Sequence, residues 1–258
     1  MPLSTEEAGE GVPVVLLHGL TATRQYVVHG SRALERGGHR VVRYDARGHG
    51  HSAPQDDYGY EALATDLSDV LRDHGIESAV LAGASMGAHT IVAFALRAPQ
   101  RVRAAVLITP AFDPEAEATF DSWDARAEGL RTGGIDGFVE ASKPFSSPVR
   151  WHDTIERVIR QRLGEHDSLA AVADAIEQVP RSRPFETWSD LARLRVPVTL
   201  VASSDEADPE HPFAVAERYA GALPDARLVT EEPGQSPLAW QGGQLSRVIA
   251  EAAAAATT

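Results

Sequence analysis

Short apolar runs alternate with amphipathic helical stretches, and this alternation constrains the fold more than any other feature. In the first 112 residues, apolar runs predict strands at 12–17, 39–45, 79–82 and 103–109. Apolar residues three or four positions apart predict helices between them, at 26–36, 60–74 and 86–96. Strands joined by helical crossovers must run parallel, so the pattern predicts an α/β fold with helices on both faces of the sheet.

The alternation stops at residue 113 and resumes at 196. Strands are predicted at 196–202 and 226–230, and helices at 212–223 and 243–255. Between them, 113–195 shows only helical stretches, such as 151–163 and 169–179. We therefore expect one domain with a first core part at 1–112, a helical cap at 113–195 and a second core part at 196–258. The sheet should have six or seven strands, because only 11 residues precede the first buried one.

Aromatic residues are concentrated in the predicted cap. The chain has 4 Trp and 7 Phe residues, and this segment holds seven of these eleven: Phe120, Trp123, Phe138, Phe145, Trp151, Phe185 and Trp188. We interpret them mainly as the core of a small helical layer, with an apolar substrate pocket as the compatible alternative.

Composition excludes several classes of protein. The chain has no cysteine, so disulfides, thiolate nucleophiles and cysteine zinc sites are ruled out. With 24 Lys+Arg against 37 Asp+Glu, the net charge of −13 opposes binding to nucleic acid or to an anionic membrane. No apolar run approaches the roughly 20 residues of a membrane span, and no signal peptide is recognisable. We expect a cytoplasmic protein with a small-molecule substrate and with neither metal nor cofactor; the oligomeric state is not indicated.

The motif Gly83-Ala84-Ser85-Met86-Gly87 lies between a predicted strand and a predicted helix. This is the context of a nucleophile elbow, in which a strained turn lifts the serine hydroxyl above the sheet. Side chains two residues before and after the serine would collide with neighbouring backbone, so both positions require glycine. The pattern predicts Ser85 as a nucleophile.

Together with three other motifs, the elbow resembles the α/β-hydrolases, of the single-domain type with a helical cap. His18-Gly19 resembles the oxyanion-loop motif, and residues 45–52, Asp-Ala-Arg-Gly-His-Gly-His-Ser, resemble the family's D-x-R-G-x-G-x-S turn. The fourth is the acidic loop near Asp205. The resemblance covers nearly the whole chain. It implies an oxyanion hole formed by the backbone N–H groups of Leu20 and Met86, and serine hydrolysis as the activity.

The family order of catalytic residues is serine, acid, histidine. The resemblance places the acid at Asp205, with Asp208 as the fallback, and the histidine at position 235. Gln235 stands there, and no histidine follows His211. An amide cannot accept the serine proton near neutral pH, and losing the triad histidine costs on the order of 10⁶ in rate.

Four explanations of the missing base remain open. Gln235 could be a deliberate His-to-Gln substitution that traps a ligand, or another histidine could act as the base. The reaction could also proceed without a complete triad, or the protein could be a slow or inactive relative. His211, six residues after Asp205, is the alternative base; a solvated histidine at a helix start is the competing interpretation. His18, His49, His51 and His89 are interpreted as structural.

The predicted function is hydrolysis of a small, fairly apolar carboxylic ester, lactone or thioester. The activity is expected to be impaired if no other residue replaces the histidine missing at position 235. The alternatives are a non-hydrolytic isomerase, lyase or cyclase, and a ligand-binding pseudo-hydrolase. In the cap, Arg157, Arg160 and Arg162 are interpreted as a solvated helix face, with recognition of a carboxylate as the alternative.

Overall fold

The computed structural model describes residues 3–204 and 208–256. Its strands and helices alternate as the sequence predicts. No helix in these two ranges is both long and apolar enough to cross a membrane. The strands are β1 (Thr5–Ala8), β2 (Val12–Leu17), β3 (His39–Tyr44), β4 (Ala79–Ala84), β5 (Val102–Ile108), β6 (Val198–Val201) and β7 (Ala226–Val229). The α-helices are α1 (Ala33–Arg36), α2 (Tyr60–Asp73), α3 (Met86–Arg97), α4 (Asp121–Ala141), α5 (His152–Leu163), α6 (Leu169–Gln178), α7 (Phe213–Ala222) and α8 (Gly242–Ala255). Short 3₁₀ helices are η1 (Pro99–Arg101), η2 (Val149–Trp151), η3 (Val179–Arg181), η4 (Trp188–Arg193) and η5 (Leu238–Trp240).

All seven strands form one sheet in the order β1-β3-β2-β4-β5-β6-β7. Every neighbouring pair is parallel except β1 and β3, which are antiparallel. The α/β-hydrolase fold and the mostly parallel sheet of six to seven strands are thereby confirmed. Because parallel strands end at the same edge, the loops after β2, β4, β6 and β7 converge there.

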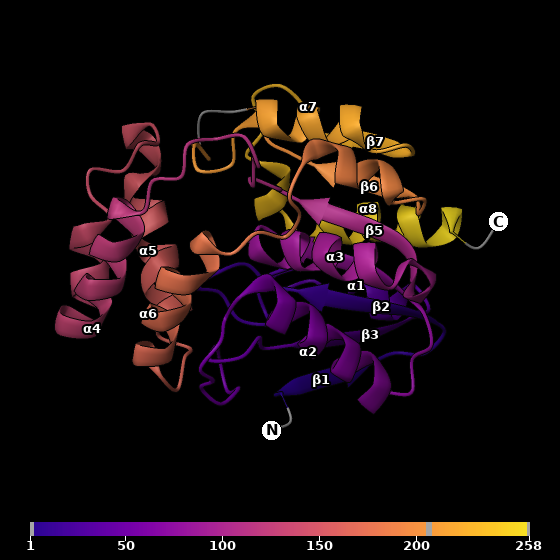
Figure 1. Cartoon of the computed structure of the whole chain (residues 1–258), viewed down its shortest axis with the longest axis horizontal. Coiled ribbons are helices and arrows are strands. Elements are labelled where there is room, and N and C mark those ends of the chain that lie inside the picture. The colour runs from indigo at the N-terminus through magenta and orange to yellow at the C-terminus, as the bar shows by residue number, and fades with distance from the viewer. Residues whose placement is uncertain (1–2, 205–207, 257–258) are drawn as a thin grey trace.

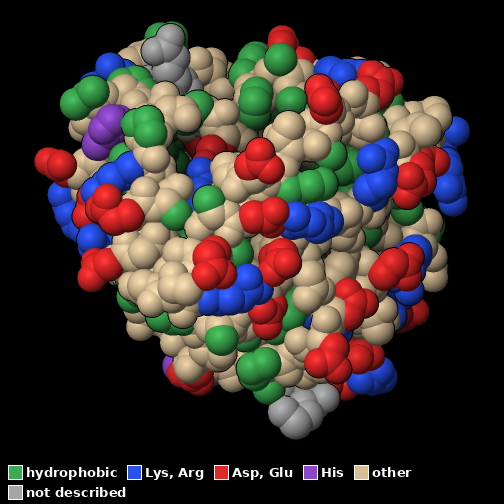
Figure 2. Space-filling model, turned by 60° about the vertical axis from the view of Figure 1, so that its left-hand side comes forward, with side chains coloured by type: hydrophobic (Ala, Val, Ile, Leu, Met, Phe, Trp, Pro, Cys, Tyr) green, Lys and Arg blue, Asp and Glu red, His purple; other side chains and the backbone are tan. Residues whose placement is uncertain are grey.

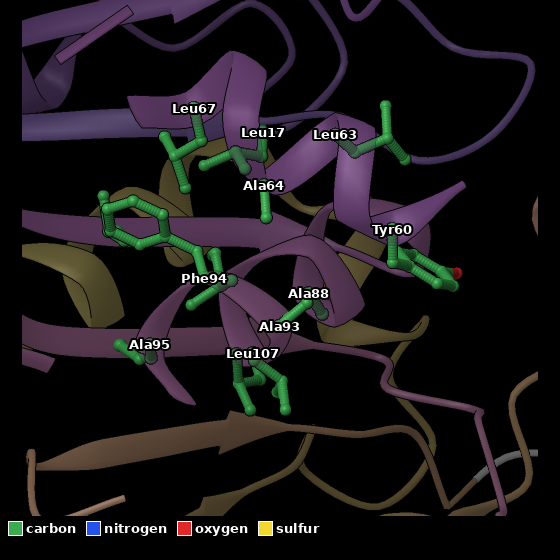
Figure 3. Close-up of a cluster of buried hydrophobic side chains, with 14 of the residues drawn as sticks. Leu17, Tyr60, Leu63, Ala64, Leu67, Ala88, Ala93, Phe94, Ala95 and Leu107 are labelled. Atoms are coloured by element: carbon green, nitrogen blue, oxygen red, sulfur yellow. The ribbon is translucent and has the colours of Figure 1, made fainter. Parts of the chain in front are cut away.

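Helices cover both faces of the sheet (Figure 1). On one face, α2 and α3 pack over the larger buried cluster, where Leu67 of α2 lies near Phe94 of α3 (Figure 3). On the other face, α1 and α8 cover a second cluster that includes Leu34 and Ile249. The helix predicted at 26–36 is wrong in length, since only Ala33–Arg36 is helical and Gly30, at φ 69°, interrupts the stretch.

Three helices, α4, α5 and α6, stand beside the sheet where the cap is predicted (Figure 1). They share a buried cluster of their own, which includes Phe138, Leu163 and Ile176. Phe185 and Trp188 pack instead into the main core around Tyr219 of α7. The aromatic residues of this segment thus serve largely to build cores.

Candidate functional site

The turn after β4 places Ser85 in a strained conformation. Its φ and ψ are 49° and −110°, a region that residues with a side chain rarely adopt. A Cβ on Gly83 would lie 2.5 Å from the backbone carbon of Gly87, and one on Gly87 would lie 2.3 Å from the carbonyl oxygen of Leu17. The predicted need for glycine at both positions therefore has a direct steric cause. Helix α3 begins at Met86, so its N-terminal dipole points toward Ser85.

The loop after β2, residues 18–21, lies against this turn. A Cβ on Gly19 would come within 3.5 Å of the Ser85 Cβ. His18 is buried and fixes the loop, since its Nε2 accepts a hydrogen bond from the Ala46 N–H at 2.9 Å and its Nδ1 donates to the Gly19 carbonyl at 2.8 Å. Burial lowers the pKa of His18 to about 4, so the ring is neutral.

Of the predicted oxyanion donors, Met86 directly follows Ser85 and Leu20 belongs to the 18–21 loop that lies against the serine turn. Within the described ranges, neither backbone N–H donates a hydrogen bond to the chain. Met86 opens a helix, and the first N–H groups of a helix have no partner inside it. Both donors are therefore available to an external oxygen.

The turn at 45–52 is structural. Asp45 is fully buried, accepts hydrogen bonds from the backbone N–H groups of Arg24 and His51, and forms an ion pair with the Arg24 guanidinium. A Cβ on Gly50, which has φ 50°, would lie 2.3 Å from the Asp45 carboxylate. Ser52 donates to the Asp45 carbonyl at 2.7 Å. This network holds the segment that anchors His18.

Ser85 is hydrogen-bonded to His211. The Ser85 Oγ lies 3.0 Å from His211 Nε2, and His211 Nδ1 lies 2.8 Å from Asp208 Oδ1. Asp208 and His211 occupy one turn after β6, closed by a hydrogen bond from the His211 N–H to the Asp208 carbonyl at 3.2 Å. We call it the 208–211 turn. Pro209 suits its second position, because its ring presets φ there.

Two opposing effects act on His211. Burial would lower its pKa, but the hydrogen bond and negative charge of Asp208, helped by the charge of Glu210, raise the pKa above the ordinary value. A serine hydroxyl that donates to such an imidazole, oriented by a carboxylate, can lose its proton as it attacks a carbonyl carbon.

The residues expected at the base and acid positions fare differently. Asp205 lies outside the described residues. Gln235 is exposed in a turn, where its backbone N–H donates to the Glu232 carbonyl at 3.0 Å. Within the described chain, its side chain has no hydrogen bond to Ser85 or His211. The competing interpretation of His211 as a solvated helix-start residue is wrong, because its side chain is 22% exposed and bonded at both nitrogens.

Two further contacts hold the segment that leads to this turn and were not anticipated. Glu231, buried after β7, accepts hydrogen bonds from the Ser203 hydroxyl and from the Ser204 N–H at 2.9 Å. From the cap, Arg126 of α4 forms an ion pair with Glu210. The signal that could have identified the turn is Asp-Pro-Glu-His itself, a turn sequence with an acid three residues before a histidine.

His89 is also structural, as expected. Its Nε2 accepts hydrogen bonds from the N–H groups of Ala111 and Phe112 at 3.0 and 3.1 Å, and its Nδ1 lies 3.0 Å from the Tyr60 hydroxyl. Burial lowers the pKa of His89 to about 3, so it stays neutral and anchors the chain where it leaves β5 for the cap.

Comparisons with known proteins identify the family of this fold. A family model described as the alpha/beta hydrolase fold matches residues 12–184. The putative carbamate hydrolase RutD of Variovorax paradoxus is 29% identical over 88% of this chain and 86% of that one, and the non-heme chloroperoxidase CPO-A1 of Kitasatospora aureofaciens is 25% identical over 91% and 88%.

Solved structures show the same fold. A thermophilic esterase of Thermogutta terrifontis, with malate bound, superposes with a TM-score of 0.80 at 22% identity, over 99% of this chain and 94% of that one. The enol-lactonase of Burkholderia xenovorans reaches 0.74 at 24% identity, over 99% and 94%. The names of the sequence relatives and the matched family indicate a hydrolase enzyme. The chain belongs to the α/β-hydrolase fold family.

Proposed function

We propose that this protein is a serine hydrolase of small carboxylic esters, lactones or thioesters. Ser85 is the nucleophile, His211 the general base and Asp208 the acid that orients the base. The N–H groups of Leu20 and Met86 form the oxyanion hole. The observation that carries the proposal is the 3.0 Å hydrogen bond between Ser85 Oγ and His211 Nε2, continued at 2.8 Å to Asp208.

The mechanism follows from this arrangement. Ser85 Oγ attacks the substrate carbonyl carbon while its proton passes to His211 Nε2, and Asp208 stabilises the imidazolium that forms. The developing oxyanion accepts hydrogen bonds from Leu20 and Met86, each worth about 3 kcal/mol in comparable enzymes. The protonated imidazole then donates to the leaving oxygen or sulfur. A water molecule, deprotonated by the same ring, hydrolyses the acyl-enzyme.

A base on the 208–211 turn makes position 235 dispensable. The nucleophile requires only that an oriented imidazole nitrogen come within hydrogen-bond distance of Oγ, whichever loop supplies it. This favours a complete triad over the pseudo-hydrolase alternative. The relatives' names include carbamate hydrolases, and carbamates share with esters and lactones an acyl carbonyl that Ser85 could attack.

Hydrolysis of p-nitrophenyl butyrate by three variants tests the proposal. We expect His211→Gln to lower kcat by about 10⁴- to 10⁶-fold, because no other group can take the proton. Gln235→His should leave the rate unchanged within about threefold. His51→Gln is the matched control, since that imidazole is exposed beside Asp167. A large gain in Gln235→His, with His211→Gln unaffected, would place the base at 235 and overturn the proposal.

Covalent labelling provides a second readout. A fluorophosphonate should modify Ser85 rapidly in the unaltered protein and slowly in His211→Gln, because the reagent requires an activated hydroxyl. Mass spectrometry of the labelled peptide identifies the serine. Absence of labelling in the unaltered protein would favour the ligand-binding alternative.

A further inference from the structure

Arg162 differs from the other arginines of its helix. Arg157 and Arg160 of α5 are exposed, and Arg160 forms ion pairs with Asp136 and Glu156. Figure 2, which brings the cap side forward, shows acidic and basic side chains interspersed over this face. Arg162, in the last turn of α5, is partly buried, and its Nε is inaccessible to solvent and has no hydrogen-bond partner. The interpretation of all three as a solvated face is wrong for Arg162.

The end of α5 docks beside the site. Glu165 accepts hydrogen bonds from the hydroxyls of Thr23 and Tyr26, at 2.7 and 3.0 Å. The next residue, His166, accepts one from the Gly50 N–H at 2.8 Å. Thr23 and Tyr26 follow the 18–21 loop in the chain. Glu165, two residues beyond α5, therefore ties this end of the helix to the segment that follows the 18–21 loop.

The guanidinium of Arg162 also interacts with the side of the site that holds the 208–211 turn. It interacts electrostatically with Tyr26 of the core and with Asp208 and Glu210 of the 208–211 turn. Its positive charge acts on His211 as well. The charge of Arg162 is thus felt both by the segment that follows the 18–21 loop and by the 208–211 turn.

The carboxylates near Arg162 are already engaged. Asp208 is bonded to His211, and Glu210 forms an ion pair with Arg126. In the ranges 3–204 and 208–256, no carboxylate forms an ion pair with Arg162. The buried Nε–H of Arg162 is costly to leave without an acceptor, and that cost is offset when an anion binds the guanidinium.

We propose that Arg162 binds a free carboxylate carried by the substrate, so that the preferred substrates are half-esters or lactones bearing a second, ionised carboxyl group. This inference rests on the proposed function and narrows it from neutral apolar esters to monoanionic ones. A guanidinium suits the role because its parallel N–H groups match both carboxylate oxygens.

Paired substrates test the inference. The mono-p-nitrophenyl esters of glutarate and adipate carry the carboxylate, and p-nitrophenyl pentanoate and hexanoate are their neutral counterparts. We expect a higher kcat/KM for a half-ester than for its counterpart. Arg162→Gln should lower kcat/KM for the half-esters about 10- to 100-fold, mainly through KM, and change that for the neutral esters less than about threefold.

Two further variants complete the design. Arg162→Lys keeps the charge and should recover part of the loss, because a lysine cannot make the bidentate contact. Arg157→Gln removes a charge from the exposed side of the same helix and is the control for general electrostatic attraction. Equal losses on charged and neutral esters in Arg162→Gln, or equal losses in Arg157→Gln, would overturn the inference.

Failure of the proposed function would appear differently. If the unaltered protein turns over none of these esters faster than buffer alone, hydrolysis itself is refuted. Calorimetric titration with glutarate and adipate then tests the anion site alone. Binding that is lost in Arg162→Gln and kept in Arg157→Gln would support it, and absence of binding would overturn it.

Discussion

The two halves of the candidate site are held in place by different forces. On one side, backbone sterics position Ser85 and the 18–21 loop, since a single methyl group on Gly83 or Gly87 would overlap main-chain atoms. On the other side, the 208–211 turn is held by side-chain contacts. These are the hydrogen bond between the Ser85 hydroxyl and His211 and the ion pair between Glu210 and Arg126.

This difference explains which half can vary. Ser85 and the Met86 N–H belong to one turn, and the 18–21 loop with Leu20 packs against it, so a shift of that turn disturbs both. The base must only bring one imidazole nitrogen to the hydroxyl, so a different loop can supply it. Here the proposed acid and base stand three residues apart on a single turn, whereas the family order separates them by a helix and a strand.

The largest effect on the second half is expected from Asp208→Asn. The amide keeps the shape of the side chain but cannot stabilise the imidazolium and can favour the wrong tautomer of His211. We expect kcat to fall about 10³- to 10⁴-fold. Steady-state kinetics with a p-nitrophenyl ester measures this loss. A loss below about tenfold would show that another carboxylate orients His211.

The same variant should shift the pH profile. Asp208 raises the pKa of His211, and the ring acts as a base only when neutral, so kcat/KM of the unaltered protein should fall as pH drops through that raised value. Removing the charge lowers the pKa, and the acidic limb should move to lower pH. A limb that stays in place would mean that His211 is not the titrating base.

The first half should respond most to Gly87→Ala. Its Cβ would lie 2.3 Å from the carbonyl oxygen of Leu17, so strand β2 and the turn must separate. We expect the free energy of unfolding to drop by about 3 kcal/mol or more, measured by urea denaturation. In the control, Gly221→Ala in α7, nothing lies within 4 Å of the new Cβ, and a gain of up to about 1 kcal/mol is expected. Comparable losses in both variants would contradict the steric account.

The same contrast decides what could be predicted from the sequence. The strand and helix pattern and the elbow with its two glycines depend on local periodicity and local sterics. These leave a direct signature in neighbouring residues, such as Gly83 and Gly87 around Ser85. Helix α1 is shorter than predicted because Gly30 adopts a φ of 69°, which the periodicity of the sequence does not show.

The second half could not be read in the same way. Whether His211 reaches Ser85, 126 positions earlier in the chain, depends on how the loop after β6 folds over the sheet edge. Arg162 likewise shares its helix and its residue type with exposed arginines. Only its burial distinguishes it, beside Glu165, which binds Thr23 and Tyr26. Long-range packing, which neighbouring residues do not encode, decides both cases.

Low pH should reduce the free energy of unfolding through His18, which anchors the 18–21 loop in its neutral form. Its pKa is about 4 in the folded protein and about 6.5 when unfolded, so the unfolded chain binds more protons between these values. The stability from neutral His18 is complete above pH 6.5 and is lost as pH falls toward 4, by up to about 3 kcal/mol. Urea denaturation at a series of pH values measures the slope. NMR titration should find the ring neutral to about pH 4; titration near 6.5 would refute the prediction.

The smallest effect is expected from the cap contact of the second half. Arg126 and Glu210 form an ion pair whose glutamate is 53% exposed, and such pairs contribute at most about 1 kcal/mol. A double-mutant cycle of Arg126→Gln and Glu210→Gln should therefore give a coupling free energy below about 1 kcal/mol, with kcat/KM lowered less than about tenfold. Glu210 also raises the pKa of His211, so Glu210→Gln should move the acidic limb in the same direction as Asp208→Asn, but by less. If either variant matched the loss in Asp208→Asn, the cap would position the base; the expected small coupling would leave that role to the hydrogen bonds of the turn itself.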